Sequence, residues 1–190
     1  MNRELQEFVQ REVASFKEQG TFRARRVLQS EQGGRALLDG KRVVMLGSSN
    51  YLGLASHPRV KEAAKRAVDR YGCGAASVSE VCGLTDLHYE LRSRLAHFLG
   101  FEDALLYSSC STANAGVIDG LLRKEDVVFS DQLNHASIID GCRISAAETR
   151  VYPHKDLVKL EEQLREAGDA RLRMIVTDGV FSICLLYTSP

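Results

Sequence analysis

Hydrophobic positions recur at helical spacing through the first half of the chain. At the N-terminus this spacing predicts an amphipathic helix. Its apolar face consists of Leu5, Phe8, Val9, Val13 and Phe16. A second helix is expected from Pro58, because proline is tolerated in a first helical turn. A third should be capped by Asp86 and end at Gly100. The buried stripe expected of this third helix is Leu87, Leu91, Leu95 and Phe98.

Short apolar segments alternate with helical segments in the second half of the chain. After an early strand around 43–46, further strands are predicted near 104–107, 127–130, 149–153 and 174–177. The helical segments between them lie near 111–123, 135–147 and 155–167. Strand and helix alternating at this interval predict right-handed βαβ units and a largely parallel sheet, which makes the fold class α/β.

Composition and charge disfavour several classes of protein. The length of 190 residues suits one α/β domain or one domain with a short appendage, and a hydrophobic content of 44% is enough for a sizeable core. Lys+Arg and Asp+Glu both number 25, so nothing favours a nucleic-acid partner. No apolar run reaches the length of a membrane span and no secretory signal begins the chain, so we expect a cytoplasmic protein without membrane association. The five cysteines are scattered without CxxC spacing, which favours reduced thiols over disulfides or a metal site.

A hydroxyl-rich turn at 108–114 is the first candidate for chemistry. It contains Ser109, Cys110 and Ser111 and directly follows the predicted strand 104–107. Where a strand runs into a helix start, free N–H groups and the positive end of the helix dipole face one point, which suits a phosphate group. Taken alone, the turn is explained equally well as an ordinary serine-capped helix.

A histidine-bearing turn at 131–137 is the second candidate. It lies one βαβ unit further on, so both turns should open at the carboxyl edge of the sheet, where parallel sheets bind ligands. His135 could stack on a flat ring or transfer protons there; alternatively, Asn134 caps a helix and His135 is simply solvated. A third turn at 177–182 should reach the same edge, with Asp178 and Ser182 as ligand-binding groups or as ordinary turn residues.

Two glycine-bearing loops, 48–53 and 72–83, are not specific by themselves. The sequence has neither a GxGxxG pattern nor a Walker pattern. A nucleotide-dependent enzyme of Rossmann or flavodoxin type therefore gains no support.

Taken together and in this order, these stretches resemble the α-oxoamine synthase family of pyridoxal-phosphate (PLP) enzymes. The likeness runs from about residue 20 to residue 182. It rests on SSNYLGLASHPRV (48–60), GCGAASVSEVCG (72–83), DLHYELRSRLAHFLG (86–100), ALLYSSCSTANAGV (104–117), SDQLNHASIIDGCRIS (130–145) and TDGVFS (177–182).

The resemblance implies an aspartate-aminotransferase-like fold (PLP-dependent transferase fold type I) with an incomplete large domain and a small N-terminal segment. The domains expected are an N-terminal helix and small-domain segment at 1–57 and a partial PLP-binding domain at 58–182. The partners implied are an acyl-CoA, an amino acid and a second copy of the protein in a homodimer. The loop 72–83 would border the acyl-CoA entry near that second copy.

The resemblance also implies roles for individual residues. The main chain around Ser109, Cys110 and Ser111 would hold the cofactor phosphate. His135 would lie flat on the pyridine ring and Ser182 would approach its phenolic oxygen. These two residues are therefore the expected catalytic groups and are expected to bind the cofactor as well.

Other positions bear on the substrate. Asn50 and Tyr51 fall in the family's substrate-facing motif. Ser79 stands where the family usually has an arginine, and Ser111 where it commonly has an aromatic residue. Loss of a cation beside an anionic substrate removes a charge-assisted contact. The VCG and SSC sequences most resemble glycine C-acetyltransferases, which predicts that glycine and acetyl-CoA give 2-amino-3-oxobutanoate; 8-amino-7-oxononanoate synthase is the alternative.

Two catalytic residues of the family are expected beyond residue 182. One is an aspartate that keeps the pyridine nitrogen protonated, and the other is the lysine that binds the cofactor aldehyde. The lysines of this chain, none in the expected motif, are Lys17, Lys41, Lys61, Lys65, Lys124, Lys155 and Lys159. The chain alone is therefore expected to be inactive, and 183–190 to be a non-native tail. A non-catalytic α/β module that binds a phosphate-bearing ligand or a partner subunit is a further alternative.

Overall fold

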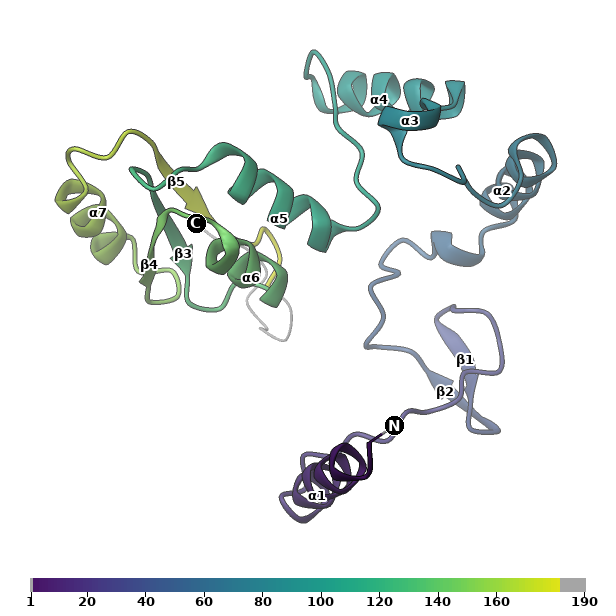
Figure 1. The fold of residues 1–190 in the computed structure, drawn as a ribbon. Coiled ribbons are helices and arrows are strands. Elements are labelled where there is room, and N and C mark those ends of the chain that lie inside the picture. Colours follow the sequence, from purple (N-terminus) through teal and green to yellow (C-terminus); the bar gives the residue numbers. More distant parts are fainter. Residues whose placement is uncertain (1, 182–190) are drawn as a thin grey trace. The chain divides into compact units, whose positions relative to one another are not determined.

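The computed structural model describes residues 2–181 and divides the chain into two compact units, Met1–Gly83 and Leu84–Pro190 (Figure 1). Each unit is described by itself. The units are groups of residues in mutual contact and do not test the domain division expected at residue 57, which stays a prediction. The tail expected at 183–190 lies outside the described residues.

The first unit begins with the predicted amphipathic helix. Helix α1 spans Arg3–Glu18, and the side chain of Asn2 caps it by accepting a hydrogen bond from the Glu4 N–H at 3.2 Å. No residue of α1 is buried, and Phe8 remains 52% exposed. The spacing of apolar residues therefore predicted the helix correctly, while its apolar face is left uncovered within this unit.

A two-stranded antiparallel hairpin follows, made of β1 (Arg35–Leu38) and β2 (Lys41–Val44). Asp39 and Gly40 connect the strands with φ angles of 49° and 74°. Two consecutive positive φ angles match the twist of a tight hairpin, and Asp-Gly is a sequence favoured there. The strand expected around 43–46 is thus present but ends at Val44, and its partner β1 was not predicted.

The rest of the first unit is helical. A 3-10 turn, η1 (Leu54–Ser56), leads into α2 (Pro58–Tyr71), and a short helix α3 (Ser79–Cys82) follows. Pro58 occupies the first turn of α2, as expected, and the side chain of His57 caps that helix.

The second unit begins with α4 (Asp86–Leu99). Gly100 ends this helix with a φ of 75°, as predicted, but the capping position belongs to Thr85 and Asp86 is the first helical residue. Most of the stripe expected to be buried is not covered: Phe98 is 83% exposed, Leu87 and Leu91 are also exposed, and Leu95 is half-buried. The stripe prediction was wrong for this chain because no other described helix or strand packs extensively on α4.

Beyond α4, the second unit contains the predicted βαβ arrangement. Strands β3 (Val127–Asp131), β4 (Glu148–Tyr152) and β5 (Arg173–Val176) form a parallel sheet in the order β4-β3-β5. Helix α5 (Cys110–Leu121) precedes β3, α6 (Ala136–Ile144) connects β3 to β4, and α7 (Leu157–Glu166) connects β4 to β5 (Figure 1). The three strands and three helices agree with the sequence prediction within a few residues.

The strand predicted at 104–107 is absent from the described structure. A strand exists only where a neighbouring strand completes its main-chain hydrogen bonds, and none of the strands within residues 2–181 lies beside this segment. Its first carbonyl, that of Ala104, instead accepts a hydrogen bond from Nε of Arg92 at 2.8 Å. The segment therefore leads into α5 without being part of the sheet.

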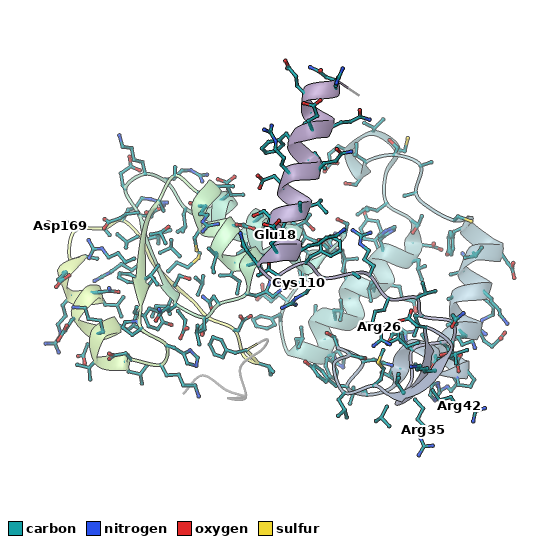
Figure 2. The ribbon with its side chains drawn as sticks, turned by 90° about the horizontal axis from the view of Figure 1, so that it is seen from below. Glu18, Arg26, Arg35, Arg42, Cys110 and Asp169 are labelled. Atoms are coloured by element: carbon teal, nitrogen blue, oxygen red, sulfur yellow. The ribbon has the colours of Figure 1, made fainter. Side chains whose placement is uncertain are left out.

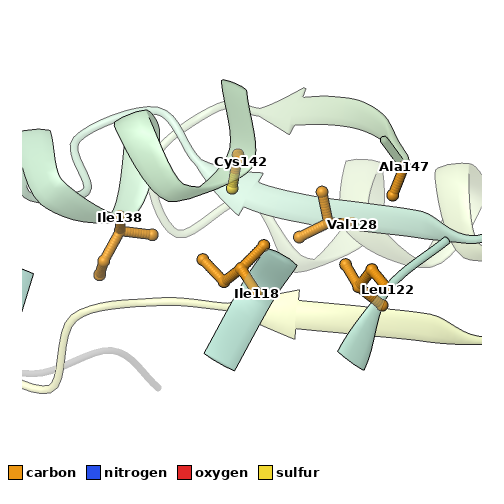
Figure 3. Packing of buried hydrophobic residues seen from close by; sticks show 6 residues of the cluster. All are labelled: Ile118, Leu122, Val128, Ile138, Cys142 and Ala147. Carbon is orange, nitrogen blue, oxygen red and sulfur yellow. The ribbon is translucent and has the colours of Figure 1, made fainter. Parts of the chain in front are cut away.

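The core lies on both faces of β3, whose five residues are all buried. On one face Val128 packs with residues of α5 and α6 and the segment that follows α6 (Figure 3). The cluster on this face is Ile118, Leu122, Val128, Ile138, Cys142 and Ala147. On the other face Val127 and Phe129 pack with Tyr152, with Leu160 of α7 and with Ala167. Burial on both faces explains why the sequence of β3 begins with consecutive apolar residues instead of alternating apolar and polar ones.

Candidate functional site

The first candidate turn forms the start of α5. Ser109 caps the helix: its hydroxyl accepts from the Thr112 N–H at 3.1 Å, and its own N–H donates to the Thr112 hydroxyl at 3.1 Å. The N–H groups of Cys110 and Ser111 have no acceptor inside a helix at these positions. No group within residues 2–181 accepts from them either. Cys110 is exposed (Figure 2), so the helix start presents unused donors to solvent.

The second candidate turn carries His135 at the start of α6. Its Nδ1 accepts a hydrogen bond from the Ser137 N–H at 3.2 Å and lies 2.7 Å from the Ser137 hydroxyl. Nδ1 therefore carries no proton, and the proton of the neutral ring sits on Nε2. The ring itself remains exposed.

A side-chain contact joins these two turns. Nδ2 of Asn114, one helical turn after Cys110, donates to the Ser137 hydroxyl at 2.9 Å. Helices α5 and α6 pack closely enough that a methyl group on Gly141 would lie 3.0 Å from Cδ1 of Ile118 and 3.2 Å from the Asn114 carbonyl. The absence of a side chain at Gly141 thus permits the approach that brings Asn114 to Ser137.

The third candidate turn is fixed to the second by Asn134. The Asn134 amide donates to the Val176 carbonyl at 2.8 Å, and its oxygen accepts from the Asp178 N–H at 3.0 Å. In return, Oδ2 of Asp178 accepts from the His135 N–H at 2.7 Å. Asn134 is only 5% exposed and does not cap α6, because His135 holds that position. The alternative in which Asn134 serves as a helix cap is therefore wrong.

The last residue of β3 is a buried carboxylate, Asp131. Asp131 accepts hydrogen bonds from the Leu133 N–H at 2.8 Å, from Nδ1 of His154 at 2.9 Å and from the Lys155 N–H at 3.2 Å. Burial raises the pKa of Asp131, but these donors lower it more, so the pKa stays below its usual value. The rings of His154 and Phe181 also form a T-shaped pair with 4.5 Å between centroids. Asp131 and His154 thus hold the turn after β4 against the strand that carries the His135 turn.

The residues expected to face the substrate lie in the first unit. The side chain of Asn50 is bonded within this unit: Nδ2 donates to the Gln32 carbonyl at 3.1 Å and Oδ1 accepts from the Ala55 N–H at 3.1 Å. Tyr51 is 82% exposed. Ser182, expected beside the cofactor ring, lies outside the described residues.

The arrangement suits an anionic group with a flat ring beside it. Unused N–H donors at a helix start bind phosphate. The main chain of His135 is bonded to Asp178, and its exposed imidazole is bonded to Ser137 through Nδ1. The carboxylate nearest His135, that of Asp178, is occupied by the His135 N–H. No cluster of three His, Cys, Asp or Glu residues that could hold a metal exists among residues 2–181. No described helix is long and apolar enough to cross a membrane.

Sequence reasoning located the three turns but missed the groups that connect them. Asn114, Ser137 and His154 were not singled out. The sequence contained a sign of each: Asn114 lies in the first candidate turn and Ser137 in the second, and His154 follows β4 just as His135 follows β3. Only the packing of α5 on α6 shows that Asn114 and Ser137 meet, and only the fold shows that His154 meets Asp131.

Comparison with known proteins identifies relatives over nearly the whole chain. The profile of the family "Aminotransferase class I and II" matches residues 41–184. An 8-amino-7-oxononanoate synthase of Thermoanaerobacter pseudethanolicus is 47% identical over 178 residues, which cover 93% of this chain and 45% of the relative. A protein of the same name from Geobacter sulfurreducens is 49% identical over 172 residues, covering 90% of this chain and 44% of the relative.

Solved structures of similar proteins superpose on this chain. A serine palmitoyltransferase from S. paucimobilis, solved with a bound PLP-myriocin aldimine, superposes with a TM-score of 0.82 at 28% identity, over 95% of this chain and 46% of that one. An 8-amino-7-oxononanoate synthase from Francisella tularensis gives a TM-score of 0.60 at 34% identity, over 74% of this chain and 38% of that one. The expected PLP-dependent transferase fold, present in part, is confirmed. The chain spans about 45% of the length of the curated relatives it matches.

Proposed function

Because the chain belongs to the aminotransferase class I and II family, we propose that the whole protein uses PLP to join an acyl-CoA to an amino acid. The observation that supports this most is the meeting of three strand-end and helix-start turns around His135, which is bonded to the other two turns directly or through Ser137. The activity is proposed for the whole protein, since this chain matches less than half the length of its relatives.

The first turn of α5 is proposed to hold the cofactor phosphate through the N–H groups of Cys110 and Ser111, with Ser109 shaping the turn. The imidazole of His135 would lie against the pyridine ring. Ser182, as the family resemblance implies, would reach the phenolic oxygen. When bound, PLP supplies an electron sink for charge that develops on the amino-acid α-carbon. Asn50 and Tyr51 are proposed to face the substrate.

We favour 8-amino-7-oxononanoate synthesis as the reaction, because relatives of that name are 46–49% identical to this chain. The product fixes the substrates by carbon count. A seven-carbon pimeloyl group and the two carbons that alanine retains after losing carbon dioxide make the nine-carbon chain. Pimeloyl-CoA and alanine would therefore give the product, free CoA and carbon dioxide.

The second candidate is glycine C-acetyltransferase, which the sequences VCG (81–83) and SSC (108–110) favour. Acetyl-CoA and glycine each contribute two carbons to 2-amino-3-oxobutanoate, so this reaction releases CoA but retains the carboxylate. The replacement of the family's arginine by Ser79 bears on either choice, because it changes the charge available to an anionic substrate.

The two candidates differ in their substrate pair and in whether the condensation itself releases carbon dioxide. We would measure CoA and carbon dioxide released by the purified full-length protein with pimeloyl-CoA plus alanine and with acetyl-CoA plus glycine. Equal amounts of both products from the first pair are expected. CoA release with the second pair alone would support the glycine reaction, and no CoA from either pair would overturn the proposed acyl transfer.

The covalent attachment of the cofactor is a further part of the proposal. None of the seven lysines falls within the turns 108–114, 131–137 or 177–182. We propose that the attachment lysine lies elsewhere in the whole protein and that the 190 residues alone are inactive. Borohydride reduction of the PLP-loaded full-length protein, followed by peptide mapping, should place the label outside these 190 residues. A homodimer and a cytoplasmic location belong to the same proposal; the first is checked by size-exclusion chromatography with light scattering.

A further inference from the structure

A polar contact joins α5 and α6, and neither of its residues belongs to the apolar cluster between these helices and β3. Ser137 is only 7% exposed, yet its hydroxyl makes two polar contacts, one across the helix interface and one within its own turn. It accepts from the Asn114 amide at 2.9 Å and lies 2.7 Å from Nδ1 of His135. Burying a hydroxyl between two helices costs desolvation free energy, so its hydrogen bonds must be satisfied for the helices to pack.

The direction of these hydrogen bonds is fixed by the chemistry of the donors. An amide nitrogen can only donate, so Asn114 donates to the Ser137 oxygen. Nδ1 of His135 already accepts from the Ser137 N–H, so it has no proton to give, and the Ser137 hydroxyl donates to it. The contacts therefore run in one direction, from Asn114 through Ser137 to His135.

We infer that Ser137 and Asn114 are positioning residues that set the tautomer and the ring orientation of His135 toward the cofactor. This inference rests on the proposed function, because it assigns these residues to the same PLP site. Because Nδ1 of His135 is held as an acceptor, the proton of the neutral ring lies on Nε2. A hydrogen bond to one ring nitrogen thus selects the histidine tautomer. Asn114 belongs to the helix whose first turn is proposed to hold the phosphate, so the contact also fixes the distance between the phosphate end and the ring end of the site.

The test compares the full-length protein with Ser137→Ala, which removes the hydroxyl, and Ser137→Thr, which restores one. The matched control is Ser145→Ala: Ser145 caps the other end of α6, and its hydroxyl accepts from the nearby Ala147 N–H at 3.2 Å. We would measure the dissociation constant of PLP and the circular dichroism of the bound cofactor in its visible absorption band, which reports how the ring is held.

Ser137→Ala should weaken PLP binding about fivefold, the equivalent of one neutral hydrogen bond, and reduce the cofactor dichroism. Ser137→Thr should recover both, and Ser145→Ala should change neither. If Ser137→Ala does not fold, Asn114→Ala breaks the other end of the contact and should give the same two changes. Suppose that Ser137→Ala or Asn114→Ala lowers the melting temperature but leaves PLP affinity and cofactor dichroism unchanged. The contact would then be structural only, and the inference would be overturned.

The outcome for the unmodified protein separates the two proposals. If it binds PLP and Ser137→Ala behaves like it, the inference fails while the proposed function stands. If the unmodified full-length protein binds no PLP at all, the proposed function fails and the inference fails with it.

Discussion

The main-chain N–H of His135 donates a hydrogen bond of 2.7 Å to the side chain of Asp178. The two residues are 43 positions apart in the sequence, and each follows a strand of the parallel sheet. Together with the bonds that Asn134 makes to Val176 and to Asp178, this contact makes the ends of β3 and β5 one rigid feature. The position of the His135 ring therefore depends on a residue that follows β5.

Removing the carboxylate of Asp178 should loosen the His135 turn. Asp178→Ala should weaken PLP binding by the full-length protein about tenfold, because a charge-assisted hydrogen bond to the His135 main chain is lost. Asp178→Asn, which keeps an oxygen acceptor, should lose less. The control is Asp169→Ala, on the exposed loop after α7 (Figure 2). Equal PLP affinity for Asp178→Ala and Asp169→Ala would show that the contact does not support the cofactor site.

The close approach of α5 and α6 should tolerate no side chain at Gly141. A methyl group there would lie 3.2 Å from the Asn114 carbonyl and 3.4 Å from Cα of Ala115, which cannot move without the helix. Gly141→Ala should therefore lower the free energy of unfolding by about 1 kcal/mol, since overpacking exceeds the gain in helix propensity. Gly120→Ala is the matched control, because nothing lies within 4 Å of its added methyl group. That variant should be neutral or slightly stabilised in chemical denaturation.

The buried carboxylate of Asp131 should make stability depend on pH in one direction. Its pKa in the folded chain is below the ordinary value of 3.8, because its hydrogen-bond donors outweigh the effect of burial. The ionised group therefore stabilises the fold at neutral pH, and this contribution is lost as the pH falls below about 4 through the folded-state pKa. Asp131→Asn should lower the melting temperature at pH 7, and its difference from the unmodified protein should shrink below pH 4. A difference that stays constant down to pH 3 would argue against this origin.

Local rules were sufficient to predict most of the second unit. The runs at β3, β4 and β5 and the helices between them follow from apolar spacing and from glycine and serine at the element ends. Gly100 could be predicted as a helix end because only a residue without a side chain readily adopts its φ of 75°. Parallel strand order then places the second and third turns at one edge of the sheet. The first turn follows no strand of the described sheet, and its position depends on the packing of α5 on α6.

The remaining features depend on contacts between distant residues, which local patterns do not specify. The segment 104–107 has the composition of a strand, but its main chain meets Arg92 instead of another strand. Phe98 has the spacing of a core residue, yet no described element covers it. The hydrogen bond between Asn114 and Ser137 joins residues 23 positions apart and exists only because Gly141 lets the two helices approach.

The central claim is that main-chain N–H groups at the start of α5 hold the phosphate of the cofactor. Cys110→Pro removes one of these N–H groups while keeping the helix, because proline is accepted at a first helical position and Ser109 before it is extended. Cys110→Ala removes the same thiol but keeps the N–H.

The decisive measurement is the affinity of the full-length protein and these two variants for PLP and for pyridoxal, which lacks the phosphate. Cys110→Ala should bind PLP like the unmodified protein. Cys110→Pro should bind it at least about tenfold more weakly, with pyridoxal affinity unchanged. Equal PLP affinity in both variants, or an equal loss for PLP and pyridoxal, would contradict the account.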